Sequence, residues 1–461
     1  MSVKIPISSF SNNDIKKLNK DLHVKPIIKD TSFFGGNNSY QPSLKTVEAF
    51  DTFSENSINY ACVPLSYFYH HLSSLNFVQP SPSSIDINFN GNLLTRQKEV
   101  RDEILEILNR TKSVVLSLHT GFGKTVMALY LASKIKLKTI ILCHRKIIVD
   151  QWISSIKKYI PDATYSILGE TPTKKARKED PNLLIDDEDP DFIIANVINV
   201  PKKSKDFYKD IGLIIVDEIH TVCTNSFSKS LLYIFPKYLI GLSATPFRTD
   251  GMDRIIELFC GPEIVYRKLS KPFNIYKLNT DYKPDSKLNI TGKLDWNSVL
   301  EGQATDVSRN ELIVNLCRYF LNRNILVLVK RKEHALKLMS ILKQYGEEVD
   351  VFMDTQRTFN YDCRILIATY SKGGVGFDHP KLDMLISGAD VEEGFQQYIG
   401  RIFRRDDVSP IYIDLIDNMS TIKKHSVTRL KICKELGGIV KDFEKIFPDF
   451  NKLIKILNKI T

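Results

Sequence analysis

The stretch SLHTGFGKTVMALYLA, Ser117–Ala132, decides the fold. It closes an apolar run, sets glycines on both sides of a phenylalanine, adds a lysine and a threonine, and continues with apolar residues at helical spacing. A strand, a tight loop and a helix in this order aim backbone N–H groups at one point, which favours a bound anion. The predicted ATP site consists of Thr120, Gly121, Gly123, Lys124 and Thr125.

Each residue of this loop has a chemical reason to be there. Gly121 and Gly123 let the backbone wrap a phosphate without a Cβ clash. Lys124 is placed to meet the β and γ phosphates, and the Thr125 hydroxyl to hold Mg²⁺. Leu118 stands where the full phosphate-binding pattern has its first glycine, so the stretch keeps only the T-G-x-G-K-T part of it.

A second motif, GLIIVDEIH, spans Gly212–His220. It is an apolar strand that ends in two adjacent carboxylates, at the sheet edge where parallel α/β folds bind ligands. We expect Asp217 to hold Mg²⁺ through water, and Glu218 to orient and deprotonate the attacking water. Together the two motifs predict ATP and Mg²⁺ as cofactors.

Strand and helix patterns alternate along most of the chain. Five apolar strands are expected between Ser113 and Ala244, and five more after Ser308, with amphipathic helices between them. The predicted fold class is α/β, with two tandem parallel-sheet domains and a small N-terminal accessory domain. The predicted parts are the accessory domain 1–90, the first α/β domain 91–268, a strand-poor crossover 269–305, the second α/β domain 306–430 and a helical tail 431–461.

Composition limits the function classes. The 461 residues carry a formal net charge of +10, which suggests a polyanionic partner without proving one. No apolar run approaches the roughly eighteen residues of a membrane helix. Seven cysteines without a C-x-x-C pair argue against zinc and disulfides, so buried free thiols are expected. We expect an intracellular monomer with no membrane association.

These motifs resemble those of the superfamily 2 helicases, because DEIH stands at Asp217–His220 and the other motifs follow in the family's order over roughly 93–417. The resemblance implies RecA-like domains. It further implies that the ATP site includes Gln97, Gly376, Asp378 and Gln397, that coupling of hydrolysis to movement uses His220, Ser243, Ala244 and Thr245, and that nucleic-acid phosphates contact Arg145, Lys146 and Thr369.

The segment ILIATYSKGGVGFD (365–378) resembles the family's motif V, and QQYIGRIFRR supplies the Q-x-x-G-R-x-x-R pattern of its motif VI. Arg401 and Arg404 are expected one turn apart on a helix, so that both face the same way. They would act as catalytic arginine fingers on ATP bound by the first domain.

Within the superfamily, DEIH is typical of the DExH group, and the segments LSATPFRTDGMDRIIELFCGP (242–262) and YACVPLSYFYHH (60–71) look like those of its XPB-like DNA translocases, including poxviral transcript-release helicases. This resemblance implies an ATP-dependent helicase or translocase of viral origin, with DNA favoured over RNA and transcription or replication machinery as candidate partners. Two alternatives stay open. One is an ATP-gated clamp or transcription-release factor that translocates without unwinding, and the other, less favoured, is a phosphotransferase acting on a small molecule.

Overall fold

The computed structural model describes the chain outside a set of short segments. These are residues 26–45, 120, 225–226, 228, 230, 244–251, 270, 286, 290–291, 293, 354–355, 357, 375–378, 393, 406, 451 and 453–461. Contacts between residues divide the chain into two compact units. The first unit comprises residues 1–118 and 122–267, and the second comprises 268–461 together with 119–121.

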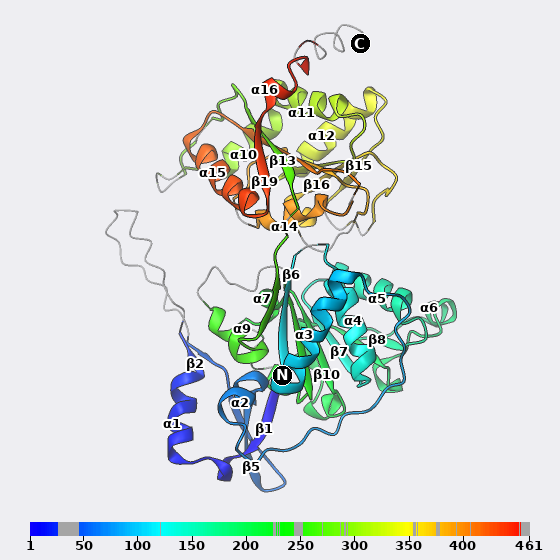
Figure 1. The fold of residues 1–461 in the computed structure, drawn as a ribbon, viewed down its shortest axis with the longest axis vertical. Helices are drawn as coiled ribbons and strands as arrows, with labels where there is room; N and C mark the ends of the chain where they lie inside the picture. The colour runs from blue at the N-terminus through cyan, green and yellow to red at the C-terminus, as the bar shows by residue number, and fades with distance from the viewer. Residues whose placement is uncertain are drawn as a thin grey trace. The chain divides into compact units, whose positions relative to one another are not determined.

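The first unit is built on a seven-stranded parallel sheet with the order β12-β6-β11-β10-β7-β9-β8. Its central strands are continuous apolar runs because helices cover the sheet, as is usual for parallel strands (Figure 1). The strands are β6 (Ser113–Leu118), β7 (Thr139–Cys143), β8 (Tyr165–Ile167), β9 (Phe192–Asn196), β10 (Leu213–Asp217), β11 (Tyr238–Ser243) and β12 (Ile264–Arg267). The helices are α3 (Thr95–Thr111), α4 (Lys124–Ile135), α5 (Lys146–Tyr159), α6 (Lys174–Glu179), α7 (Ile219–Val222) and α9 (Asp253–Cys260).

The N-terminal segment adds a small antiparallel sheet of order β1-β5-β4 and shares a core with the first parallel sheet. Val63 and Phe68 belong to the same buried cluster as Ile214 and Phe259. Helix α2 therefore packs on α9 and not on a core of its own. The elements are β1 (Ser2–Pro6), α1 (Asn12–Asp21), β2 (His23–Val24), β3 (Val47–Glu48), β4 (Asp51–Glu55), β5 (Ile58–Pro64) and α2 (Leu65–His71).

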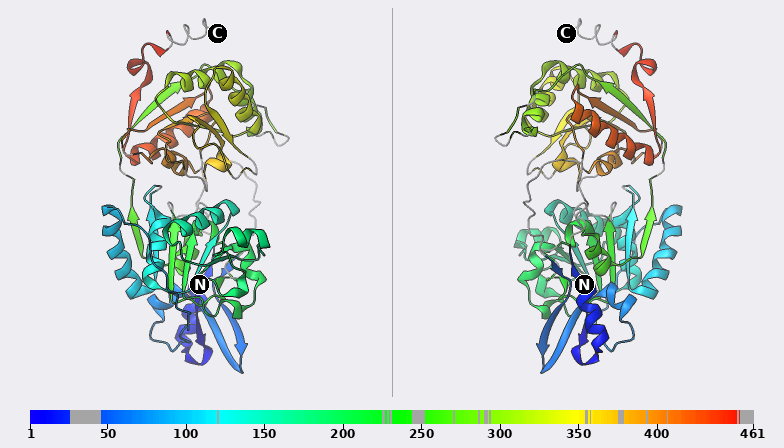
Figure 2. Two further views of the ribbon diagram at one scale, coloured as in Figure 1. Left: turned by 90° about the vertical axis from the view of Figure 1, so that its right-hand side faces the viewer. Right: turned by 90° about the vertical axis from the view of Figure 1, so that its left-hand side faces the viewer.

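The second unit holds another seven-stranded parallel sheet, with the order β15-β16-β14-β17-β18-β13-β19. Helices flank this sheet on both sides (Figure 2). The strands are β13 (Phe273–Asn279), β14 (Ile325–Val329), β15 (Val349–Phe352), β16 (Ile365–Thr369), β17 (Met384–Ser387), β18 (Ile411–Ile416) and β19 (Gly438–Asp442). The helices are α10 (Trp296–Thr305), α11 (Val307–Tyr319), α12 (Lys332–Gln344), α13 (Tyr370–Gly373), α14 (Phe395–Ile399), α15 (Ser420–Glu435) and α16 (Phe443–Ile446).

All ten predicted strands are present, but two predicted segments differ from the structure. Residues 269–305, expected to be a strand-poor crossover, contribute β13 and α10 to the second unit. The expected helical tail 431–461 includes β19, the edge strand beside β13. Both strands carry lysines and exposed side chains because they lie toward the sheet edge, so neither reads as a buried apolar run.

Candidate active site

The loop between β6 and α4 has the backbone that its sequence predicted. Gly121 and Gly123 have φ values of 86° and 98°, in the left-handed region that favours glycine. Gly123 caps the N-terminus of α4, whose first helical residues are Lys124 and Thr125. The Lys124 ammonium donates a 2.9 Å hydrogen bond to the Leu118 carbonyl at the other end of the loop. The loop is therefore closed on itself at the N-terminus of a twelve-residue helix.

Gln97 braces this loop from the interior. Its side chain is 4% exposed; Oε1 accepts a 2.9 Å hydrogen bond from the Leu94 amide, and Nε2 donates a 2.8 Å bond to the Phe122 carbonyl. A Cβ atom at Gly123 would lie 2.6 Å from Gln97 Nε2. Gln97 thus joins the start of α3 to the loop, while its contact with the adenine edge stays a prediction.

Asp217 and Glu218 stand at the carboxyl end of β10. The β6–α4 loop follows the carboxyl end of β6, and β11 lies between these two strands. Because all three strands are parallel, the carboxylates and the loop lie at the same edge of the sheet. The Trp152 indole Nε1 donates a 2.9 Å hydrogen bond to Asp217 Oδ2, and the Glu218 amide donates a 3.0 Å bond to Oδ1. Burial, and then the charge of Glu218, raise the pKa of Asp217 to about 6, whereas the Trp152 bond and the charge of Lys124 lower it. Lys124 and Asp217 therefore act on each other electrostatically.

The donor chemistry fits the cofactors that the sequence predicts. Glycines with positive φ, a helix N-terminus and Lys124 suit a phosphate chain. The Thr125 hydroxyl and the Asp217 carboxylate are oxygen ligands, which Mg²⁺ prefers. Among the residues that the structure describes, no cluster of three or more His, Cys, Asp or Glu side chains is arranged to hold a metal.

Two of the residues predicted from sequence to couple hydrolysis to movement, His220 and Ser243, lie together. His220 Nδ1 is 3.2 Å from Ser243 Oγ and 3.6 Å from Glu218 Oε2. Thr221 Oγ1 is 3.0 Å from His144 Nδ1, which ties the end of β7 to the carboxylate motif. Burial and the charges of Arg145 and His220 lower the pKa of His144 to about 4, so His144 is neutral near pH 7. Neither Thr221 nor Trp152 was predicted as a site residue.

In the second unit, Arg401 points its guanidinium at the backbone carbonyls of the glycine pair at the end of α13. Its Nε donates a 3.2 Å bond to Gly373 O, and Nη2 donates a 2.6 Å bond to Gly374 O. Gln397 lies in α14, which packs on α15. The arginine of motif VI is thus fixed to the segment that carries motif V.

The prediction that Arg401 and Arg404 share one helical face is wrong. Helix α14 ends at Ile399, a 3-10 turn spans Gly400–Ile402, and Arg404 lies beyond it. Glycine weakens a helix at Gly400, and the ring of Phe403 packs edge-on against Phe273 at 5.0 Å, which draws the chain away from the helix axis.

The predicted nucleic-acid residues have different surroundings. Arg145 is exposed at the N-terminus of α5, and Lys146 is exposed and pairs with Glu170 at 2.8 Å. Thr369 is 5% exposed, with its hydroxyl 3.1 Å from Ser371 Oγ. The predicted site residues Thr120, Ala244, Thr245, Gly376 and Asp378 lie outside the described residues.

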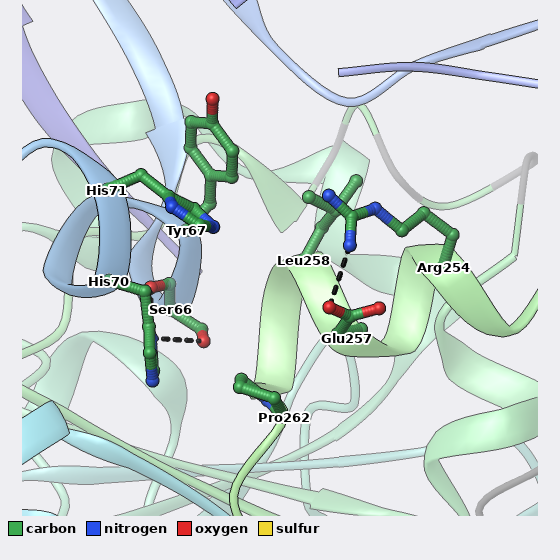
Figure 3. Close-up of a pocket in the computed structure, with 8 residues that line it drawn as sticks. All are labelled: Ser66, Tyr67, His70, His71, Arg254, Glu257, Leu258 and Pro262. Carbon is green, nitrogen blue, oxygen red and sulfur yellow. Dashed lines mark hydrogen bonds and ion pairs between the residues drawn. The ribbon is translucent and has the colours of Figure 1, made fainter. Parts of the chain in front are cut away.

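A separate recess of about 130 Å³ lies between α2 and α9 (Figure 3). Its two charged groups pair with each other, since Arg254 Nη1 lies 2.7 Å from Glu257 Oε1. His70 Nδ1 lies 2.8 Å from the Ser66 carbonyl. The recess contains none of the predicted site residues, and these two polar contacts lie within α9 and within α2.

Comparison with known proteins identifies the family. A family model described as "Type III restriction enzyme, res subunit" matches residues 90–248. "Putative helicase 161L" of Invertebrate iridescent virus 6 is 39% identical over 381 residues, which are 78% of this chain and 85% of that protein. The chain belongs to the superfamily 2 helicases.

Other relatives of this helicase agree. "Putative helicase 055L" of Frog virus 3 is 31% identical and the match covers 76% of this chain and 79% of that protein. A "Putative ATP-dependent RNA helicase" of Acanthamoeba polyphaga mimivirus is 27% identical, over 93% of this chain and 85% of that protein. All three relatives are viral proteins, in agreement with the viral origin that the sequence suggested.

Among solved structures, the helicase fold resembles that of S. cerevisiae Dbp5 bound to RNA and ADP BeF3. The TM-score is 0.53 at 15% identity, over 78% of this chain and 93% of that one. The two parallel sheets are therefore tandem RecA-like domains, as predicted. The helicase is a nucleic-acid-dependent ATPase. Among its described residues, no helix has both the length and the apolar character needed to cross a bilayer.

All seven cysteines are buried and none forms a disulfide, as expected.

Proposed function

We propose that this helicase moves along DNA by coupling ATP hydrolysis to closure of its two RecA-like units. The observation that supports the proposal best is that the β6–α4 loop and the Asp217–Glu218 pair stand at one sheet edge and influence each other electrostatically. A phosphate cradle beside a carboxylate pair suits phosphoanhydride hydrolysis.

Each residue has a definite task in the proposal. Lys124 and the first turn of α4 bind the phosphates, while Thr125 and Asp217 hold Mg²⁺. Glu218 orients the attacking water and accepts its proton. When bound, Mg-ATP supplies the phosphoanhydride bond whose cleavage releases the closed state. Arg401 and Arg404 contribute positive charge to the γ-phosphate only when the units close.

DNA is the proposed substrate, because the motifs resemble those of XPB-like DNA translocases. Some relatives are named as RNA helicases, so the test must include both nucleic acids. Arg145 and Lys146 are the proposed phosphate contacts, and contacts of this kind are sensitive to salt and nearly blind to sequence.

The decisive measurement is the ATPase rate with single-stranded and duplex DNA and RNA at two salt concentrations. We expect DNA to stimulate the rate several-fold, less so at high salt, and Lys124→Ala to abolish turnover. A rate indifferent to every polynucleotide would overturn the proposal. Strand displacement beside triplex displacement then separates two modes: removal of a third strand without duplex opening indicates translocation alone, as a clamp or release factor would show.

A further inference from the structure

The loop Gly388–Val391, which follows β17, is held by side chains from several helices. Residues 392–394 connect it to α14, the helix in which motif VI begins. Five buried or half-buried side chains from four helices converge on these four residues, namely Gln303, Arg309, Tyr370, His425 and Arg429. We refer to this loop with its five side chains as the motif VI mount.

Two arginines bind the loop. Arg309 Nη1 donates a 2.5 Å hydrogen bond to the Gly388 carbonyl. Arg429 Nη1 lies 2.7 Å from both Asp390 Oδ1 and the Val391 carbonyl. Both guanidinium groups are fully buried. The carbonyl groups at the two ends of the loop are therefore each fixed by an arginine.

Each of these arginines is anchored in turn by a buried carboxylate at the C-terminal end of β18 or just beyond it. Arg309 Nε lies 2.9 Å from Asp417 Oδ1, and Arg429 Nε donates a 3.0 Å bond to Asp414 Oδ1. Asp414 and Asp417 are both 0% exposed. The planar guanidinium can bind the strand on one side and the loop on the other, which a lysine cannot do.

Three further side chains complete the mount. The Tyr370 hydroxyl donates a 2.6 Å bond to the Ala389 carbonyl, and the Asp390 amide donates a 3.1 Å bond to Gln303 Oε1. His425 spans two carboxylates of the segment, with Nδ1 2.5 Å from Asp390 Oδ2 and Nε2 3.1 Å from Glu392 Oε2. Consequently the carbonyls of Gly388, Ala389 and Val391 and the amide of Asp390 all have side-chain partners.

The mount continues into the helix. Phe395, the first residue of α14, is 1% exposed and packs against the Tyr412 ring at a centroid distance of 5.1 Å. The Tyr412 hydroxyl donates a 2.8 Å bond to Asp414 Oδ1, the carboxylate that also anchors Arg429. The loop and the first residue of α14 are thus both held by contacts with β18 and its C-terminal end.

From this geometry we infer that the buried cluster positions the arginines of motif VI, with Arg429, Arg309 and Tyr370 as positioning residues for ATP hydrolysis. Buried ion pairs add little net stability over apolar residues of similar size, because both charges lose their hydration. Their gain is a fixed geometry. A charge delivered to a transition state needs such geometry, since a shift of about 1 Å can cost a hundredfold in rate. The inference rests on the proposed function of Arg401.

Arg429→Lys is the central test, because it keeps the charge but cannot hold Asp414, Asp390 and Val391 together. We expect kcat for ATP hydrolysis to fall about 10- to 100-fold. The affinity for ADP should stay within about twofold, whereas the affinity for ADP with beryllium fluoride should fall in step with kcat. Arg364→Lys is the matched control. Arg364 is a largely buried arginine of this unit that also binds backbone carbonyls, those of Cys317 and Phe320, away from the mount.

Two further variants keep the inference testable if Arg429→Lys does not fold. Tyr370→Phe removes one hydroxyl and should lower kcat several-fold with the same ADP pattern. In an Arg401→Ala background, Arg429→Lys should add almost no further loss, because residues that act as a unit are not additive. Additive losses, or losses no larger than those of Arg364→Lys, would overturn the inference.

The proposed function can fail separately. If Arg401→Ala alone retains full ATPase activity, the catalytic role of motif VI fails and the mount has nothing to position. If Arg401→Ala abolishes turnover while Arg429→Lys and Tyr370→Phe keep wild-type kcat, only the positioning role of the mount is refuted.

Discussion

The indole of Trp152 donates a hydrogen bond of 2.9 Å to Asp217 Oδ2, and so a residue in the middle of α5 orients the carboxylate at the end of β10. The Trp152 side chain is 1% exposed, and the bond opposes the upward shift that burial imposes on the Asp217 pKa. Helix α5 and the carboxylate motif are therefore linked by a direct contact and not only by their common sheet.

The first prediction follows from this contact. Trp152→Phe should preserve packing but leave Asp217 less well oriented and more readily protonated. We expect the Mg²⁺ concentration for half-maximal ATPase activity to rise about tenfold or more, as for other residues that orient metal ligands. A Mg²⁺ titration measures this, and ATP binding in EDTA, which should not change, is the internal control. An unaltered Mg²⁺ curve would contradict it.

A second prediction concerns Gly123, where an added Cβ would meet Gln97 Nε2 at 2.6 Å and φ is 98°. Gly123→Ala should reduce kcat/KM for ATP about 100-fold or more by distorting the phosphate loop. Gly346→Ala is the matched control, because its φ is 76° but nothing lies within 4 Å of the new methyl group. It should cost about 1 kcal/mol of stability while activity persists. Equal activity losses in both variants would argue against a specific role of the loop geometry.

Coupling gives a third prediction. Ser243→Ala removes the hydroxyl that lies 3.2 Å from His220. We expect ATPase activity without nucleic acid to be nearly unchanged, and stimulation by nucleic acid to fall about fivefold to tenfold. Ser113→Ala, in a neighbouring strand, is a suitable comparison, since its buried hydroxyl has no hydrogen-bond partner among the described residues. If both variants are stimulated like the wild type, Ser243 carries no coupling.

A fourth prediction concerns acid stability of the second unit. His334 is 1% exposed, its Nε2 lies 2.7 Å from Asn310 Oδ1, and burial and then the charges of Arg309 and Lys337 lower its pKa to about 3. Between pH 6.5 and about 3 the unfolded chain binds a proton that the native state does not, so stability falls as pH falls.

The measurement is the free energy of unfolding at pH 7 and pH 5. His334 should account for a loss of about 2 kcal/mol between these values. In His334→Gln this part of the pH dependence should disappear. Denaturant unfolding followed by the fluorescence of Trp296 in a Trp152→Phe background reports on the second unit alone. A His334→Gln variant with the wild-type pH dependence would refute the assignment.

Much of the fold was predictable because buried parallel strands are long apolar runs with helical segments between them. Strands β6, β7, β10 and β14 are of this kind. Strands β8, β12, β13 and β19 were missed because they are short or carry polar side chains near a sheet edge. A strand that is buried on one face alone has no continuous apolar run, and that run is the signal on which the prediction depends.

The site shows a similar division. Lys124, Asp217 and the glycines lie in compact motifs whose spacing states their chemistry, so sequence could find them. Trp152 was not predicted, because only the three-dimensional structure brings it to Asp217. The turn after α14, and the partners of Arg429, depend on contacts between distant segments, which no local pattern encodes.

Strand β13 lies between β18 and β19, although it precedes both by most of the second unit. During synthesis on a ribosome, every strand of the first sheet is complete once Arg267 has emerged. The second sheet, in contrast, cannot cover β13 until Asp442 has been added. A nascent chain halted in this interval would display an uncovered strand edge beside a finished nucleotide-binding half, which makes late translational pausing the step at which this enzyme is most exposed to aggregation.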